Sequence, residues 1–359
     1  MIVGGRQGAA TWIIAFAMVG AAVPLVAQDS TLHSSSHETA PPVRGSLPVR
    51  FAFTGDINLG SITLPDGLPP DSGRALFTAV DSLLSGDLVV GNFEGVLADS
   101  GTSLKCGPPP DSTADSLTPR ALPRPARRRI GKAAPQVKER HLCYAFATPT
   151  FLARRLIDAG FTHLNLANNH ANDFGLAARA HTDSALNALG FRTYGPLGQI
   201  VIDTLGSGDS ITVVGLIGFT TYPFAYDLLD LPRSVAVVDS VRRLVDVLVV
   251  TFHGGTEGAK AVRLGEGLEY LGEEPRGDLR RWAHAVIDAG ADAVVGHGPH
   301  VLRAAEFYHR KPVFYSLGNF ATFRGFNLFV ALVLRPLLRL HLAGVGNLLS
   351  PFYWSVCQI

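Results

Sequence analysis

The stretch GADAVVGHGPHVLRAAEFYHRKPVFYSLGNF, residues 290–320, decides the fold prediction for this chain. It opens on a glycine that ends a helix and continues into a short apolar strand at residues 293–295. The strand leads into Gly296-His297-Gly298-Pro299-His300, where two glycines and a proline form a tight turn from which two imidazoles can project. A hairpin-like return through residues 309–311 leads to a second strand at residues 312–315. Because α/β proteins place their sites in loops at strand ends, this stretch predicts an α/β fold with a site there.

Short apolar strands that end in polar residues recur along the chain. Strands are expected at residues 49–53, 87–90, 162–166, 200–205, 211–219, 246–251 and 327–334, and helices at residues 72–84, 149–159, 176–189, 239–244 and 276–289. The polar residues at the strand ends are Asp56, Glu94, Asn169, His170, His253, His297 and His300. We expect these side chains to converge in one pocket, although they are far apart in sequence.

These side chains offer carboxylate, amide and imidazole ligands and no thiolate. Such ligands suit divalent Mn, Fe, Zn, Co or Mg, and two ions bridged by a carboxylate are the arrangement that hydrolyses phosphate esters. Asn169 and His170 present an amide oxygen and an imidazole side by side, with Asp173 near enough in sequence to orient the ring. An isolated pair of histidines in a tight turn is more often part of a hydrogen-bonded turn. The recurrence of such residues at several strand ends favours a metal site.

The N-terminal sequence predicts an exported protein. Residues 1–27 have a charged start at Arg6 and then an apolar run, typical of a signal segment that is cleaved or that stays as a membrane anchor. Residues 28–48 are rich in Ser, His, Thr and Pro and are expected to form a disordered linker. We therefore expect a periplasmic or extracellular protein. The formal net charge of +1 shows no basic excess, which argues against nucleic-acid binding.

Three cysteines, Cys106, Cys143 and Cys357, are too few for a disulfide scaffold, but an exported protein can hold one bridge. The first two bracket an insertion at residues 99–143 that is rich in proline and arginine and has no apolar period. We predict a Cys106–Cys143 disulfide, with Cys357 free. The insertion is interpreted as a solvated surface loop, with contact to a polyanion as the alternative. The apolar tail at residues 336–359 is interrupted by arginine and is not expected to span a membrane.

Six motifs give the chain a family resemblance. They are TGDINLG at 54–60, GNFEGVL at 91–97, LANNHANDFG at 166–175, TFHGGTE at 251–257, GADAVVGHGPHV at 290–301 and YSLGNF at 315–320. With these motifs in this order, residues 49–335 closely resemble the CapA family of capsule and poly-γ-glutamate synthesis proteins. That family is similar to the metallo-dependent, calcineurin-like phosphatases. The resemblance implies an α/β domain over residues 49–335, built as a sandwich of two mixed β-sheets flanked by helices.

The resemblance also implies a role for each matching residue. Metal-binding positions are matched by Asp56, Glu94, Asn169, His253, His297 and His300. Glu94 takes the position of the bridging acid. His170 matches a general-acid histidine near the leaving group, and Asp173 is the candidate that orients its ring. Further positions of the same motifs that are expected to line the pocket are Asn58, Asn92, Glu257 and Asn319.

Several positions depart from the family patterns. The phosphatases have a histidine two residues after the first aspartate, where this chain has Asn58, and Glu94 replaces an aspartate. Their last motif is GHxH, whereas this chain has GHxxH. The CapA pattern HWGxEY reads HGGTEG from His253 onward, and GHHPH reads GHGPH, with Gly298 in place of a histidine. These changes bear on the metal count and on activity rather than on the fold.

The resemblance implies an exported protein of capsule, poly-γ-glutamate or envelope-polymer synthesis that hydrolyses a phosphoester bond with two divalent metal ions. Its expected partners are an anionic polymer or phosphoester substrate and a membrane synthase complex. Two alternatives stay open. One is a non-enzymatic subunit that binds polymer or acts as a scaffold for the synthase, and the other is a hydrolase of γ-glutamyl amide bonds with the same metals.

Overall fold

The computed structural model describes residues 48–106, 143–207, 210–324, 334–343, 347–348 and 353–358. The expected signal segment, residues 28–47 of the expected linker, residues 107–142 of the insertion and residues 327–333 of the expected final strand lie outside these ranges. Within the described ranges, no helix combines the length and the apolar character needed to cross a membrane.

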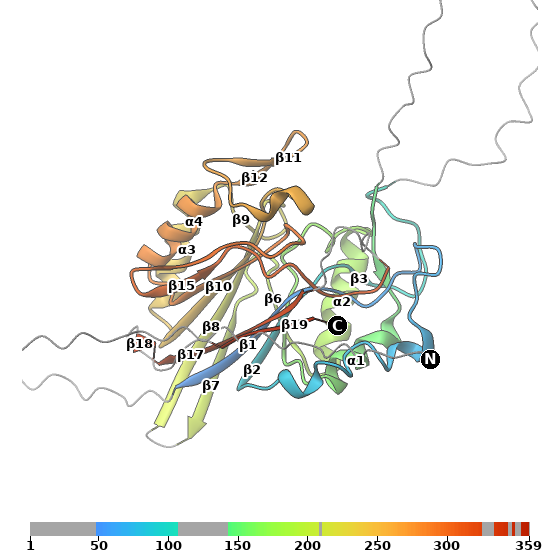
Figure 1. Ribbon diagram of the computed structural model, residues 1–359, viewed down its shortest axis with the longest axis horizontal. Helices are drawn as coiled ribbons and strands as arrows, with labels where there is room; N and C mark the ends of the chain where they lie inside the picture. Colours follow the sequence, from blue (N-terminus) through green and yellow to red (C-terminus); the bar gives the residue numbers. More distant parts are fainter. Residues whose placement is uncertain are drawn as a thin grey trace, which may run out of the picture. The chain divides into compact units, whose positions relative to one another are not determined.

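Two mixed β-sheets form the centre of the described fold (Figure 1). In the described part of the chain the first sheet holds β1 (Val49–Asn58), β2 (Leu88–Phe93), β5 (His163–Asn165), β6 (Arg192–Tyr194), β16 (Asn319–Thr322), β17 (Leu334–Ala343), β18 (Asn347–Leu348) and β19 (Tyr353–Gln358). The second holds β7 (Val201–Ser207), β8 (Ser210–Thr220), β9 (Tyr226–Asp227), β10 (Val247–His253), β13 (Ala293–His297), β14 (Ala305–Tyr308) and β15 (Lys311–Phe314). Their main orders are β18-β17-β1-β2-β5-β6 and β14-β15-β13-β10-β8-β7. The central strands of each sheet run parallel, and β17, β14 and β7 run antiparallel to their neighbours.

Helices and smaller elements connect these strands. The helices among the described residues are α1 (Arg154–Asp158), α2 (Gly175–Ala188), α3 (Leu231–Arg242) and α4 (Leu279–Asp288). Short 3-10 turns are η1 (Pro70–Gly73), η2 (Asp81–Leu83), η3 (Thr150–Ala153) and η4 (Ala259–Val262). Two small sheets pair β3 (Val96–Leu97) with β4 (Ala147–Thr148) and β11 (Glu269–Leu271) with β12 (Glu274–Gly277).

The core has three layers, which follow from the alternation of side chains along each strand. Phe51 and Phe53 of β1 point into the space between the sheets and share a buried cluster with Val249 of β10. On the outer faces, Ala52 packs with the layer of α1 and α2, and Leu248 packs with the layer of α3 and α4. Figure 1 shows these two helix pairs on opposite sides of the sheets. The expected sandwich of two mixed sheets flanked by helices is therefore confirmed.

Two expected helices differ from the structure. The prediction of a helix at residues 72–84 was wrong. This segment consists of turns and of the short 3-10 elements η1 and η2. Asp71, Ser72 and Gly73 have φ of 52°, 53° and 74°, so the backbone turns away from a helical path before the apolar residues begin. The helix expected at residues 239–244 is α3, which begins at Leu231. Asp230 caps it by accepting a hydrogen bond from the backbone N–H of Arg233.

Two strands extend beyond their expected ends. β1 continues to Asn58, because β16 pairs with its last residues in the register Asp56 to Asn319. Asp56 therefore lies inside the strand and not after it. β17 runs to Ala343 and pairs antiparallel with β1, so the first sheet includes backbone from the segment that was expected to be a tail.

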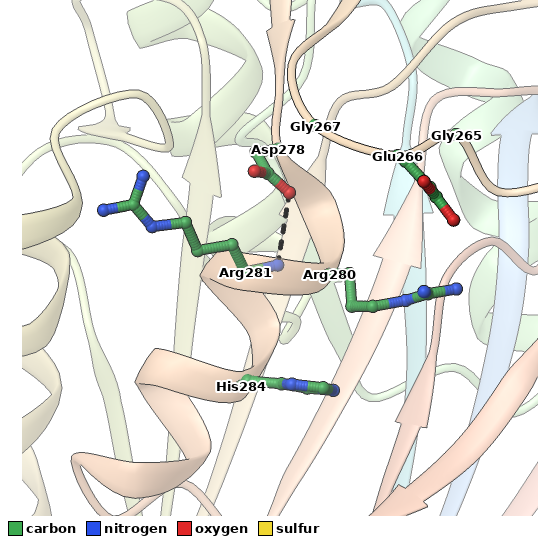
Figure 2. Close-up of a pocket in the computed structure, with 7 residues that line it drawn as sticks. All are labelled: Gly265, Glu266, Gly267, Asp278, Arg280, Arg281 and His284. Carbon is green, nitrogen blue, oxygen red and sulfur yellow. Dashed lines mark hydrogen bonds between the residues drawn. The ribbon is translucent and has the colours of Figure 1, made fainter.

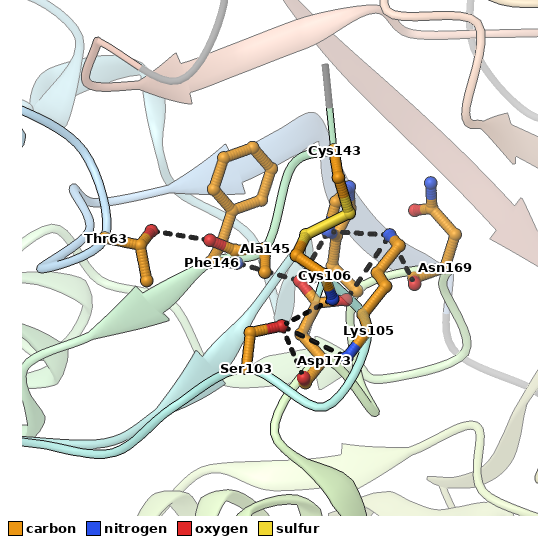
Figure 3. The surroundings of a disulfide bond; sticks show 10 residues. Thr63, Ser103, Lys105, Cys106, Cys143, Ala145, Phe146, Asn169 and Asp173 are labelled. Atoms are coloured by element: carbon orange, nitrogen blue, oxygen red, sulfur yellow. Dashed lines mark hydrogen bonds and ion pairs between the residues drawn. A yellow bond between two sulfur atoms is a disulfide. The ribbon is translucent and has the colours of Figure 1, made fainter. Parts of the chain in front are cut away.

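The predicted disulfide is confirmed. Cys106 and Cys143 are bonded, with their Cα atoms 5.6 Å apart. The bond joins the described ends of the proline-rich insertion and fixes residues 103–106 beside the turn that follows β5, as Figure 3 shows.

Candidate metal centre

The central strands of both sheets bring the predicted residues to one place. His253 and His297 end the neighbouring parallel strands β10 and β13 and lie directly opposite each other in the register. In the first sheet, Asp56 of β1 lies between Asn92 of β2 and Asn319 of β16. The end of one sheet thus supplies imidazoles, and the end of the other supplies a carboxylate and amides.

Asp56 sits where the backbone of β1 comes very close to another segment. A Cβ atom on Gly55 would lie 2.0 Å from Gly318 O, so only glycine fits at this position. Asp56 Oδ1 accepts a hydrogen bond from Asn92 Nδ2 at 2.8 Å, and Oδ2 lies 3.1 Å from His300 Nδ1. Burial disfavours the charged form, but the neighbouring imidazoles of His297 and His300 hold the pKa of Asp56 well below its usual range.

Glu94 occupies the middle of the cluster. One of its oxygens, Oε1, lies 3.7 Å from His253 Nε2, 3.7 Å from His300 Nε2 and 4.0 Å from His170 Nε2. The side chain is fully buried, and neither oxygen has a hydrogen-bond partner among the described residues. Burial raises the pKa of Glu94 well above its usual range. A buried carboxylate in this condition is costly unless a cation or a proton neutralises it.

His300 connects the two carboxylates. It lies in the turn after β13 with φ of 59°, a left-handed conformation that is uncommon for a residue with a side chain. Its Nδ1 lies 3.0 Å from Asn319 Oδ1 and 3.1 Å from Asp56 Oδ2, which leaves Nε2 facing Glu94. Burial lowers the pKa of His300, but the charges of Glu94 and Asp56 outweigh it and raise the pKa to about 10. The field at this position therefore stabilises positive charge.

His170 is held by a second set of contacts, on the side of the disulfide. Its Nδ1 lies 2.7 Å from Asp173 Oδ2, so this carboxylate orients the ring as expected and leaves Nε2 directed at Glu94. Lys105 Nζ pairs with the other oxygen of Asp173 at 3.3 Å and donates to Asn169 O at 3.3 Å. Figure 3 shows Lys105 reaching from beside the disulfide toward these residues. Burial lowers the pKa of His170, and Asp173 opposes that effect.

Two predicted residues, Asn169 and Asn58, have no hydrogen bond or ion pair with the carboxylate and imidazole groups of the cluster among the described residues. Asn169 Oδ1 is buried without a hydrogen-bond partner among the described residues, and only its backbone carbonyl contacts Lys105. Asn58 has a local structural role, because its Nδ2 donates to Glu94 O at 3.3 Å and its Oδ1 accepts from Gly60 N at 3.1 Å. Asn58 therefore does not replace the histidine that the phosphatases have at this position.

Four residues near the site were not predicted. They are Lys105, Asn165, Asn168 and Arg276. Asn165 Nδ2 donates to Asn92 Oδ1 at 2.9 Å, and Asn168 Nδ2 donates to Phe93 O at 2.8 Å. Both asparagines lie at or just after the end of β5, so the strand-end rule is a signal that could have found them. Lys105 is adjacent to a predicted disulfide, whereas nothing in the local sequence indicates Arg276.

The donor set fits a divalent cation. Asp56, Glu94 and His300 each offer one ligand atom, and these atoms lie within 4.8 Å of one another. Around them, His253 Nε2 lies 3.7 Å from Glu94 Oε1 and His297 Nδ1 lies 3.4 Å from Asp56 Oδ1, and both nitrogens are buried. Oxygen and imidazole donors without thiolates are the set that Mn, Fe, Zn or Mg accept. Each of these imidazoles thus faces a carboxylate of the Asp56–Glu94–His300 group, which is the observation that supports a metal centre.

A separate cavity lies away from this cluster. Its volume is about 240 Å³, and it is lined by Gly265, Glu266, Gly267, Asp278, Arg280, Arg281 and His284 (Figure 2). Asp278 is already used as the cap of α4, accepting from the backbone N–H of Arg281 at 3.3 Å. None of the predicted site residues lines this cavity, so its size gives no reason to move the site there.

The fold is a sandwich of two mixed β-sheets flanked by helices, with carboxylates and imidazoles gathered at strand ends. Residues 209–323 match the family model described as bacterial capsule synthesis protein PGA_cap. The chain is 31% identical over 185 residues to the capsule biosynthesis protein CapA of Bacillus anthracis, covering 47% of this chain and 42% of that protein. It is 32% identical over 187 residues to the PGA biosynthesis protein CapA of Bacillus subtilis (strain 168), covering 47% and 45%. These matches confirm the resemblance of this chain to the CapA family.

More distant relatives and solved structures extend the comparison. A probable polyglutamine synthesis accessory protein of Mycobacterium tuberculosis is 26% identical over 178 residues, covering 43% of each chain. A hypothetical protein from Thermus thermophilus covers 86% of this chain and 99% of its own, with 13% identity and a TM-score of 0.45. A putative 5'-nucleotidase from Staphylococcus aureus covers 86% of this chain and 53% of its own, with 13% identity and a TM-score of 0.40. The chain spans less than half the length of the curated relatives that it matches.

Proposed function

We propose that this chain is an exported, CapA-like protein that hydrolyses a phosphoester bond during synthesis of capsule, poly-γ-glutamate or another envelope polymer. The observation that carries the proposal is the state of Glu94, a fully buried carboxylate with three imidazoles around it and no hydrogen bond among the described residues. A divalent cation satisfies that carboxylate and its neighbours together. The Cys106–Cys143 disulfide supports export, since disulfides persist in oxidising compartments.

Each residue of the cluster has a proposed part. Asp56, Glu94 and His300 would hold the cation, with His253 and His297 as further nitrogen ligands. A bound divalent cation supplies Lewis-acid activation of a phosphoryl oxygen and of an attacking water. Asn169 is proposed as a ligand on the family resemblance alone. The proposal of a second ion has the same basis.

His170 is the proposed proton donor to the leaving oxygen. Its Nε2 is the ring atom that faces the cluster, because Nδ1 is engaged by Asp173. Asp173 stabilises the protonated ring against the cost of burial, and Lys105 pairs with the second oxygen of Asp173. The substrate proposed for this arrangement is an anionic polymer or a phosphoester, and a membrane synthase complex is the proposed partner.

A non-enzymatic role is the second candidate, and one specific observation favours it. Asn58 stands where the phosphatases have a histidine, so the site lacks one imidazole that they use. The amide of Asn58 does not replace it, because it is used in backbone contacts. A centre with fewer nitrogen ligands would fit a subunit that binds polymer or acts as a scaffold for a synthase, with metal bound but little turnover.

Two substitutions separate these functions. The rate of bis(p-nitrophenyl) phosphate hydrolysis with added Mn²⁺ and the metal content are measured for wild type, His170→Ala and Glu94→Ala. We expect His170→Ala to keep its metal and to lose a factor of roughly 10² to 10⁴ in rate, and Glu94→Ala to lose both metal and rate. His284→Ala is the matched control, because this histidine is bonded to Glu306 outside the cluster. Wild-type protein with full metal and no turnover on any phosphoester supports the scaffold, and protein without metal excludes metal-dependent hydrolysis.

A further inference from the structure

Glu257 lies beside the cluster with its two carboxylate oxygens in different environments. Oε1 accepts a hydrogen bond from Arg276 Nη2 at 2.8 Å. Oε2 lies 3.8 Å from His300 Nε2, the same ring atom that faces Glu94 at 3.7 Å. Among the described residues no hydrogen bond to Oε2 is found. One oxygen of Glu257 is therefore used by the arginine, and the other faces the atoms of the proposed metal centre.

Arg276 is placed so that it fixes this orientation. Its side chain is completely buried and lies in β12. Nε donates to Gly255 O at 3.2 Å, and Nη1 donates to Glu274 Oε1 at 3.2 Å and to Tyr222 OH at 3.3 Å. The guanidinium thus binds both the backbone and the side chain of the segment that carries Glu257. Because the guanidinium is a rigid planar fork, these contacts determine the direction of the carboxylate as well as neutralise it.

The distances suit a shared cation. Neighbouring ligand atoms around an ion with bonds of about 2.1 Å lie roughly 3 Å apart in an octahedral site. The separations of 3.7 and 3.8 Å from His300 Nε2 to Glu94 Oε1 and Glu257 Oε2 are within a small side-chain movement of that value. The carboxylates of Glu94 and Glu257 therefore face the same nitrogen of His300, and both oxygens of Glu94 lack a hydrogen-bond partner among the described residues.

We propose that Glu257 is a metal ligand of this centre and that Arg276 is the residue that positions it. The inference rests on the proposed metal-dependent function. Glu257 supplies an anionic oxygen to a centre in which Asn58 offers no ligand atom, since both ends of the Asn58 amide are used in local contacts. Carboxylates that bind metals are typically hydrogen-bonded by a second residue, and Arg276 has that relation to Glu257.

The affinity for Mn²⁺ tests the proposal without reference to turnover. Free Mn²⁺ is followed by electron paramagnetic resonance during titration of metal-stripped full-length protein. Glu257→Gln is expected to weaken binding at one site by about tenfold or more, while its amide oxygen still accepts from Arg276. Arg276→Gln is expected to weaken the same site by roughly 10-fold to 100-fold. Glu274→Gln is the matched control, because this carboxylate pairs with the same arginine and has no measured contact with the cluster.

The outcomes separate this inference from the proposed function. Unchanged affinity and stoichiometry in Glu257→Gln, with weakened binding in Glu94→Gln, overturns the ligand assignment and leaves the metal centre in place. Equal weakening in Glu274→Gln and Glu257→Gln also overturns it, since the effect is then one of charge around Arg276. Wild-type protein that binds no Mn²⁺ overturns both proposals. If Arg276→Gln does not fold, the comparison of Glu257→Gln with Glu274→Gln still decides.

Discussion

Removal of the Cys106–Cys143 disulfide is expected to lower both stability and turnover while the metal stays bound. The two cysteines are 37 residues apart, and constraining a loop of that length in the unfolded chain stabilises the fold by about 4 kcal/mol in the chain-entropy model. The bond also fixes the segment in which Ser103 Oγ donates to Asp173 O at 3.0 Å and Lys105 Nζ pairs with Asp173 Oδ1 at 3.3 Å. The residues proposed to hold the cation come from other segments of the chain.

The assay compares the double variant Cys106→Ser/Cys143→Ser with wild type and with Cys357→Ser, which removes the third cysteine. Guanidinium unfolding followed by tryptophan fluorescence gives the free energy of unfolding, since Trp282 is buried in the core. A loss near 4 kcal/mol is a change of about 10³ in the unfolding equilibrium. A loss below about 0.5 kcal/mol would refute the loop-closure reasoning. Unchanged phosphoester turnover in the folded double variant would refute the role given to the Lys105 segment.

Three further predictions follow from single side chains. His163 Nε2 of β5 lies 2.8 Å from Asp203 Oδ2 of β7, and burial lowers the pKa of His163. Below about pH 6.5 the unfolded chain therefore binds a proton that the folded chain does not. Stability should therefore fall as the pH drops below that value, and urea unfolding of His163→Asn at pH 5.5 and 7.5 should show a weaker fall. Lys105→Met should lower turnover with unchanged metal content, and Lys105→Arg should recover part of it; equal rates in both variants contradict a role for the charge. Gly298→Ala should cost about 1–3 kcal/mol in thermal unfolding, since φ is 111° and a Cβ would lie 2.7 Å from Gly254 O. Gly190→Ala is its control, with positive φ but open space around the Cβ, and an equal loss there excludes the steric part.

Much of the fold could be predicted because the strands are short apolar runs with clear ends. The expected strands at residues 246–251 and 293–295 correspond to β10 and β13, and both end in histidines that lie opposite each other. The parallel arrangement then makes the gathering of strand-end residues a geometric consequence. The disulfide could be predicted for a different reason, since the sequence indicates export and two of the three cysteines lie at the ends of one insertion.

The parts that could not be predicted depend on contacts between distant segments. The apolar spacing at residues 72–84 resembles a helix, but Phe77, Val80 and Leu84 are buried from turns that pack on the first sheet. The true end of β1 depends on pairing with β16, which comes from a far later part of the chain. Asn58 stands where the phosphatases have a histidine and was expected to line the pocket, yet its amide is used by the backbone nearby. No local pattern distinguishes such structural use from metal binding.

The metal content of the purified protein tests the central claim most directly. Wild type and Glu94→Gln are stripped with chelator, incubated with Mn²⁺, Zn²⁺, Fe²⁺ or Mg²⁺, passed through a desalting column and analysed by inductively coupled plasma mass spectrometry. Glu94 is the choice because both of its buried oxygens lack a partner among the described residues, and the amide of glutamine keeps its size while removing the charge. The account predicts at least one tightly held divalent ion per wild-type chain and a clear loss of that ion in Glu94→Gln. If wild type retains no more of any of these ions than Glu94→Gln does, the proposed metal centre is contradicted.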